Sequence, residues 1–212
     1  LLDTYIRAEE SEKVSAFDDL TLVELIVDRG EDAVDALPKG LREDHEAVAE
    51  TIENNVRRLI IDEMAVNPRY YEKMSELLDA LIAQRRQEAL DYQAYLRRIV
   101  DLTKRVSKPE QQTAYPAAIT SGVLRALYDN LETSVPDTIR DHAPGYLEEG
   151  NPVDREELAL AVDREIRAVK KSGWRGNRFK EREVRNAIQA TLGDDEALVD
   201  RIFEIVKAQR DY

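Results

Sequence analysis

Apolar residues recur at intervals of three and four along most of the chain, the spacing of one face of an α-helix. Val48, Ile52 and Val56 are a clear example, and Gly30, Gly173 and Gly193 stand where such patterns end. No stretch alternates β-branched and polar residues between hairpin turns. We therefore predict an all-α fold, a multi-helix bundle with helices over residues 19–29, 44–62, 121–131, 154–171, 178–192 and 194–210.

One further helix is predicted to be very long. At Asn67-Pro68, Asn can cap a helix and Pro can occupy its first position. No other Pro or Gly occurs before Pro109, and the apolar stripe continues to Val106. A polar run at residues 84–88 interrupts the stripe, as a solvated stretch or a kink would. The pattern predicts one helix over about residues 68–106.

Pro and Gly are densest in a short segment after the middle of the chain. Pro136, Pro144, Gly145, Gly150 and Pro152 fall close together. Such a cluster indicates a linker. We expect a helical domain with the long helix over residues 1–135, a linker over 136–153, and a C-terminal three-helix subdomain over 154–212.

The composition is that of a globular helical protein. Of 212 residues, 42% are hydrophobic and 35% are charged, and cysteine is absent, which excludes disulfides and thiolate metal sites. No apolar run approaches the roughly 20 residues of a membrane-spanning helix, and the first residues do not resemble a signal peptide. We expect a cytoplasmic location. The start without Met suggests a part cut from a longer protein.

Charge is distributed unevenly along the chain. The formal net charge of -13 argues against nucleic acid binding over the whole surface. Between Arg164 and Arg185, however, nine Lys and Arg accompany only three Glu, a net charge of +6, which leaves -19 for the rest. The sequence thus contains one basic segment in an acidic chain.

The chain contains no recognisable catalytic signature. The phosphate-binding pattern Gly-x-x-x-x-Gly-Lys-[Ser/Thr] does not occur, and acidic residues are present without the strands on which nucleases gather them around a metal. His45 and His142 each adjoin an Asp but lack a second His at metal-binding spacing. We interpret them as capping or surface residues, and predict no catalytic residue, metal or cofactor in this chain.

The basic segment contains the best candidate for an interaction site, a glycine-containing turn between two predicted helices. Its cations could contact nucleic acid phosphates or an acidic partner. Alternatively, the cations neutralise acidic neighbours and Trp174 fills a helical hairpin. The candidate binding residues are Lys170, Lys171, Trp174, Arg175, Asn177, Arg178, Lys180 and Arg182.

Several strings resemble the C-terminal helical region of the restriction (R, motor and endonuclease) subunit of type I restriction-modification enzymes. They are spread over most of the chain and are much longer than short catalytic signatures. The strings are SEKVSAFDD (11–19), ENNVRRLIID (53–62), NPRYYEKMSELL (67–78), GWRGN (173–177) and REVRN (182–186).

This resemblance implies a larger parent subunit, an ATP- and Mg-dependent site-specific deoxyribonuclease with its nuclease and two motor domains upstream. The family's catalytic residues have no matching positions in this chain. The corresponding helical region is implied to dock the motor onto the methyltransferase and specificity subunits. Two hypotheses follow: a non-catalytic assembly module, or a DNA-contacting module whose basic turn, residues 170–182, contacts double-stranded DNA.

Overall fold

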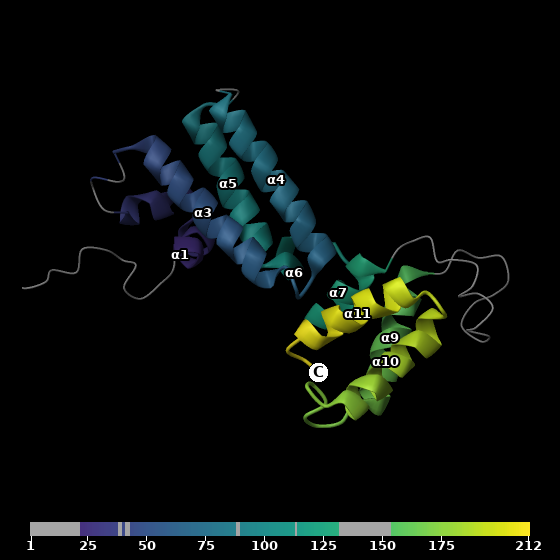
Figure 1. Cartoon of the computed structure of the whole chain (residues 1–212). Coiled ribbons are helices and arrows are strands. Elements are labelled where there is room, and N and C mark those ends of the chain that lie inside the picture. The colour runs from purple at the N-terminus through teal and green to yellow at the C-terminus, as the bar shows by residue number, and fades with distance from the viewer. Residues whose placement is uncertain (1–21, 38–39, 41–42, 88–89, 113, 132–153) are drawn as a thin grey trace, which may run out of the picture. The chain divides into compact units, whose positions relative to one another are not determined.

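The computed structural model describes residues 22–37, 40, 43–87, 90–112, 114–131 and 154–212. Within these ranges every regular element is a helix (Figure 1), so the predicted all-α class is confirmed. None of the described helices is both long and apolar enough to cross a membrane. The elements are α1 (Leu22–Arg29), η2 (Gly30–Ala36), α3 (His45–Glu63), α4 (Pro68–Arg86), α5 (Tyr92–Ser107), α6 (Pro109–Gln112), α7 (Gly122–Asn130), α9 (Arg155–Val169), α10 (Arg178–Leu192) and α11 (Glu196–Ala208).

The prediction of one helix over about residues 68–106 is wrong. α4 ends at Arg86, and α5 begins after Asp91, whose side chain accepts a hydrogen bond from the Ala94 amide at 2.9 Å. Arg98 then donates to Gln84 at 2.9 Å, so α5 runs back along α4 (Figure 1). The polar run offers no apolar face to bury, and an Asp cap starts a new helix without needing Pro or Gly.

The described residues form two compact units. Unit 1 comprises the described parts of 1–59 and 75–112, and unit 2 comprises 60–74 with the described parts of 113–212. This division differs from the predicted domains, and the predicted linker, 136–153, lies outside the described residues. The three helices expected after residue 154 are present as α9, α10 and α11, but they share one hydrophobic core with α7. The predicted three-helix subdomain is therefore not confirmed as a unit of its own.

In unit 1, a buried carboxylate joins three helices. Glu53 on α3 is 5% exposed. It accepts hydrogen bonds from Arg85 Nε on α4 at 2.8 Å and from the Tyr95 hydroxyl on α5 at 2.9 Å. Arg85 also contacts Glu46 at 2.8 Å. The bond to Glu53 raises the pKa of Arg85, and burial raises that of Tyr95, so neither side chain changes its charge near neutral pH.

In unit 2, a polar network joins the residues before α4 to α7. Asn67 donates to Asp129 at 2.7 Å and accepts from Asn130 at 2.8 Å, and the Tyr115 hydroxyl donates to Asp129 at 2.8 Å. Asn67 also accepts from the amide of Tyr70 at 3.4 Å, so it caps α4 as predicted. These bonds satisfy polar groups that are largely removed from water.

Arg85→Ala should destabilise unit 1, because it leaves the Glu53 carboxylate buried without its guanidinium partner. We expect the free energy of unfolding to fall by about 3 kcal/mol in urea denaturation. Arg57→Ala is the matched control, since the Arg57 and Asp79 side chains are 40% and 59% exposed and their pair should contribute no more than about 1 kcal/mol. Equal losses in the two variants would contradict a special role for Glu53.

Asp129→Asn should change how stability depends on pH. Burial raises the pKa of Asp129, although the hydrogen bonds from Asn67 and Tyr115 lower it. The net shift of the pKa is upward, so the folded state holds the proton more tightly than the unfolded state. The stability that protonated Asp129 contributes is therefore complete below about pH 4 and is lost as the pH rises through the folded pKa. Asn keeps the acceptor oxygen without the titration. Denaturation from about pH 4 to 7 should therefore show a smaller loss of stability for the variant than for the native chain.

Candidate interaction surface

The segment between α9 and α10 is a tight turn built on two glycines. Gly173 and Gly176 have φ angles of 64° and 77°, a left-handed conformation in which a side chain is disfavoured. Asn177 follows and accepts hydrogen bonds from the amides of Phe179 and Lys180 at 3.2 and 3.3 Å, so it caps α10. The side-chain oxygen of Asn177 is thus occupied by hydrogen bonds at the start of α10.

Trp174 is part of the core. It is 3% exposed and lies among the apolar side chains of α7, α9, α10 and α11, with its ring centroid 6.2 Å from that of Phe203. Its Nε1 has no hydrogen-bond partner within the described part of the chain. The alternative interpretation of the sequence, in which Trp174 fills a helical hairpin, expected such burial.

Three of the candidate cations bind backbone oxygens. The Arg175 guanidinium donates to Lys207 at 2.8 Å, to Tyr212 at 2.6 Å and also to Gln209, which ties the turn to the segment after α11. Lys180 donates to the carbonyl of Ser172 at 2.7 Å, and Lys170 donates to that of Asp211 at 3.4 Å. The carbonyls of Ser172 and Asp211 are neutral, so these two bonds position the lysines without cancelling their charge.

Carboxylates pair with few cations in this region. Lys171 lies 2.9 Å from Glu183, and Arg185, just beyond the candidate residues, lies 2.7 Å from Asp200. The interpretation that acidic neighbours neutralise the cations therefore applies to Lys171. No Asp or Glu side chain in the described ranges pairs with the remaining candidate cations, which are Lys170, Arg175, Arg178, Lys180 and Arg182.

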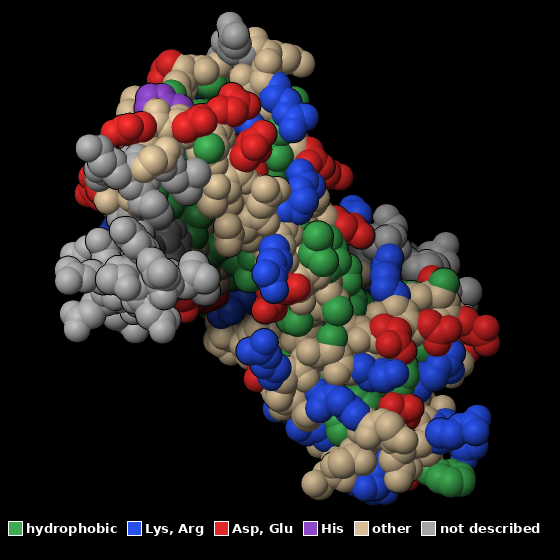
Figure 2. Space-filling model, turned by 60° about the vertical axis from the view of Figure 1, so that its left-hand side comes forward, with side chains coloured by type: hydrophobic (Ala, Val, Ile, Leu, Met, Phe, Trp, Pro, Cys, Tyr) green, Lys and Arg blue, Asp and Glu red, His purple; other side chains and the backbone are tan. Residues whose placement is uncertain are grey.

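The outer face of α10 combines two of these cations with an exposed aromatic ring. Arg178 and Arg182 are exposed, one helical turn apart, and have no hydrogen bond or ion pair to any described residue. Phe179 is 79% exposed. Lys and Arg side chains are prominent at the end of unit 2 that carries this turn (Figure 2). We call Arg178, Phe179 and Arg182 the α10 face.

Phe179 was not among the residues selected from the sequence. Val184, Ile188 and Leu192 form the buried stripe of α10. At about 100° per residue, Phe179 lies on the opposite side of the helix. Its position relative to this stripe is the signal that could have identified it.

His45 is not among the residues of this surface. His45 is the first residue of α3, and its ring stacks on that of Tyr92 at 3.8 Å between centroids, whereas His142 lies outside the described residues. In the ranges that the structure describes, no group of three or more His, Cys, Asp and Glu could hold a metal ion.

No protein-family model, curated protein or solved structure matches the chain.

Arg175→Ala should lower stability, whereas Arg178→Ala should not. The first change removes three hydrogen bonds from a charged donor to backbone oxygens, which we expect to cost about 1.5 kcal/mol or more. The second removes an exposed side chain without a partner, with an effect within about 0.5 kcal/mol. Thermal and urea denaturation of both variants measures the difference. A cost for Arg178→Ala as large as that for Arg175→Ala would show that the α10 face is also used for folding.

Proposed function

We propose that this chain is a non-catalytic helical assembly module of the restriction subunit of a type I restriction enzyme. In this role it docks the ATP-dependent, DNA-translocating nuclease onto its methyltransferase and specificity partners. The resemblance of five strings to that family's C-terminal region motivates the assignment. The observation that carries it is the α10 face, an exposed phenylalanine beside two arginines without partners among the described residues.

The chemistry of the α10 face suits a protein partner. Aromatic residues and arginine are enriched in the cores of protein interfaces, and a few such side chains provide most of the binding energy. Phe179 has most of its surface left to bury. Arg178 and Arg182 need not break a contact with any described residue in order to bind a carboxylate.

A second candidate function is contact with double-stranded DNA. It is favoured by the five cations of the turn that have no Asp or Glu partner among the described residues. Such positive charges attract the phosphate backbone regardless of base sequence. In this function the turn would hold duplex DNA while the motor domains move it.

Phe179→Ser should weaken docking strongly if the assembly proposal is correct. We expect the affinity for a purified methyltransferase and specificity complex to fall by about 30-fold or more, because a buried aromatic anchor typically contributes about 2 kcal/mol. Ile61→Ser is the matched control, since Ile61 is another exposed apolar residue, with 63% of its surface accessible. Binding can be measured by co-purification and by titration. An unchanged affinity for the Phe179→Ser variant would contradict docking through this face.

DNA contact is tested separately from docking by variants that remove cations and keep the Phe179 ring. Arg178→Ala with Arg182→Ala is compared with Arg86→Ala and Arg97→Ala, an equal reduction of charge at exposed positions in unit 1. DNA contact predicts that duplex binding weakens as salt rises. In a plot of the logarithm of the binding constant against the logarithm of the salt concentration, the slope should become shallower in the first double variant alone. The change should be about 0.9 for each phosphate that this variant no longer neutralises. Binding that is equally weak in both double variants would argue against DNA contact by the α10 face.

A further inference from the structure

The exposed side of α10 differs from one edge to the other. At about 100° per residue, Phe179, Asn186 and Ala190 lie along its middle, opposite the buried stripe of the helix. Arg178 and Arg182 lie along one edge of this strip. The exposed side therefore has an uncharged middle and one cationic edge.

The other edge is balanced in charge. Glu183 lies one turn after Phe179, on the side away from the two arginines, and pairs with Lys171 at 2.9 Å. Glu181, the second acidic residue of α10, accepts a hydrogen bond from the amide of Gly176 at 2.9 Å. Both carboxylates of this helix are thus bound elsewhere, and neither balances the cationic edge.

The spacing of the two arginines indicates what they can bind. Arg178 and Arg182 stand four residues apart, which places their Cβ atoms about 5–6 Å from each other. A guanidinium presents a planar fork of donors that matches a carboxylate in two parallel hydrogen bonds. Neither arginine has a hydrogen bond, ion pair or ring contact with a described residue, so both forks are available. The cationic edge therefore fits two carboxylates held side by side.

A nucleic acid backbone fits this arrangement less well than a protein does. Phosphates carry negative charge along the whole strand, whereas Glu183, with 47% of its side chain exposed, lies on the opposite edge. Phe179 is 79% exposed and adds apolar surface of the kind that protein interfaces bury. The combination favours a protein surface that is apolar at its centre and acidic on one side.

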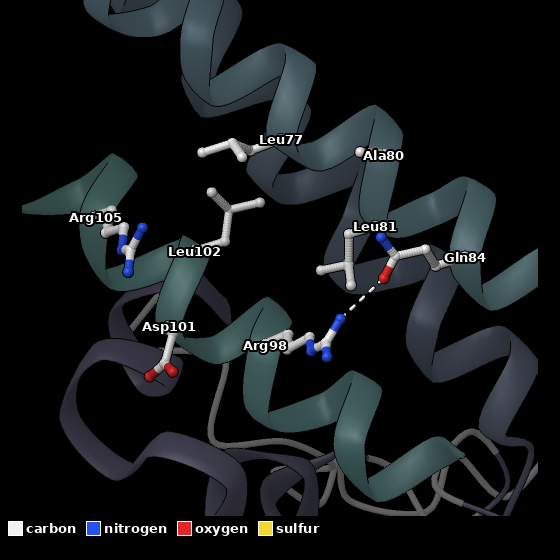
Figure 3. A pocket seen from close by; sticks show the side chains of 8 residues that line it. All are labelled: Leu77, Ala80, Leu81, Gln84, Arg98, Asp101, Leu102 and Arg105. Atoms are coloured by element: carbon white, nitrogen blue, oxygen red, sulfur yellow. Dashed lines mark hydrogen bonds between the residues drawn. The ribbon is translucent and has the colours of Figure 1, made fainter. Parts of the chain in front are cut away.

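The groove between α4 and α5 shows no such difference in charge. It has a volume of about 270 Å³, and Leu81 and Leu102 in its lining are each only 6% exposed (Figure 3). Arg98 and Asp101 balance each other there, and Arg105 already interacts with another residue. Neither charge nor exposed apolar area selects a ligand for this groove.

We propose that the partner bound by the α10 face presents an apolar pocket for Phe179 with two carboxylates along one side. These carboxylates bind Arg178 and Arg182 in forked hydrogen bonds. The small side chains of Asn186 and Ala190 let the partner approach α10 closely. This inference rests on the assembly function proposed above and specifies the chemistry of its docking partner.

Exchange of the two arginines tests the carboxylates. Arg178→Lys with Arg182→Lys keeps both positive charges but loses the planar forks. At about 150 mM NaCl, where charges beyond about 8 Å are screened, we expect the affinity for a purified methyltransferase and specificity complex to fall about tenfold. Arg178→Glu with Arg182→Glu should lower the affinity by about 100-fold or more, because like charges would then face each other.

Arg86 and Arg97 provide the matched control. Both are exposed arginines of unit 1, and their joint exchange for Lys or for Glu should leave the affinity unchanged within about twofold. Thermal unfolding verifies that every variant is folded, and binding to duplex DNA is measured in parallel.

The outcomes separate this inference from the assembly function. If Phe179→Ser weakens docking but neither arginine exchange does, docking through the face stands and the carboxylate pairing is wrong. The pairing is also wrong if the lysine exchange binds like the native chain and only the glutamate exchange is weaker, since positive charge alone then suffices. Loss of duplex binding with retained docking in the glutamate exchange assigns the arginines to DNA and overturns the inference. An unchanged affinity for Phe179→Ser overturns both proposals.

Discussion

A buried carboxylate must be paired, and in unit 1 this requirement determines where three helices lie. Glu53 on α3 is removed from water, so α4 has to present Arg85 and α5 has to present Tyr95 at hydrogen-bond distance. The apolar faces alone would tolerate sliding of one helix along another, because the hydrophobic effect has little directionality. The hydrogen bonds of Glu53 to Arg85 and Tyr95 prevent such sliding. The register of α5 against α4 is fixed in the same way.

Unit 2 meets the same constraint with different groups. Asn67, Asp129 and Tyr115 satisfy one another where α4 starts beside α7, and the guanidinium of Arg175 satisfies three backbone oxygens near the end of α11. Asn67 and Arg175 each also bind a backbone group at a helix end that would otherwise be unsatisfied. The α9–α10 turn is thereby attached to the core through Trp174 and to the end of the chain through Arg175. This attachment gives the α10 face an ordered base.

The sequence predicted helix positions well wherever an apolar stripe met a cap or a glycine, as at Asn67-Pro68, Asn177 and Gly193. It failed between Arg86 and Tyr92, because Asp91 can cap a helix or lie exposed on the surface of one, and only packing decides between these. Composition located the basic turn, but composition could not separate its cations by role. Whether a guanidinium binds a distant carbonyl, as in Arg175, or no described residue, as in Arg178, depends on the tertiary fold. The sequence could not predict that α5 folds back along α4 either, because this depends on the break between the two helices.

Pairing, rather than net charge, decides which cations of an acidic protein are available to a ligand. Lys171 and Arg185 each have a carboxylate partner, and a ligand would have to compete with it. Arg98 and Lys180 bind neutral oxygens, so their hydrogen bonds are used while their charges still act on the surroundings. Arg178 and Arg182, which bind no described residue, have both charge and hydrogen bonds to offer. Because charges more than about 8–10 Å apart are largely screened at physiological salt, the acidic remainder of the chain opposes an anion mainly at long range. Close to the α10 face the local cations dominate, so the net negative charge of the chain does not oppose the proposed binding of an acidic partner there.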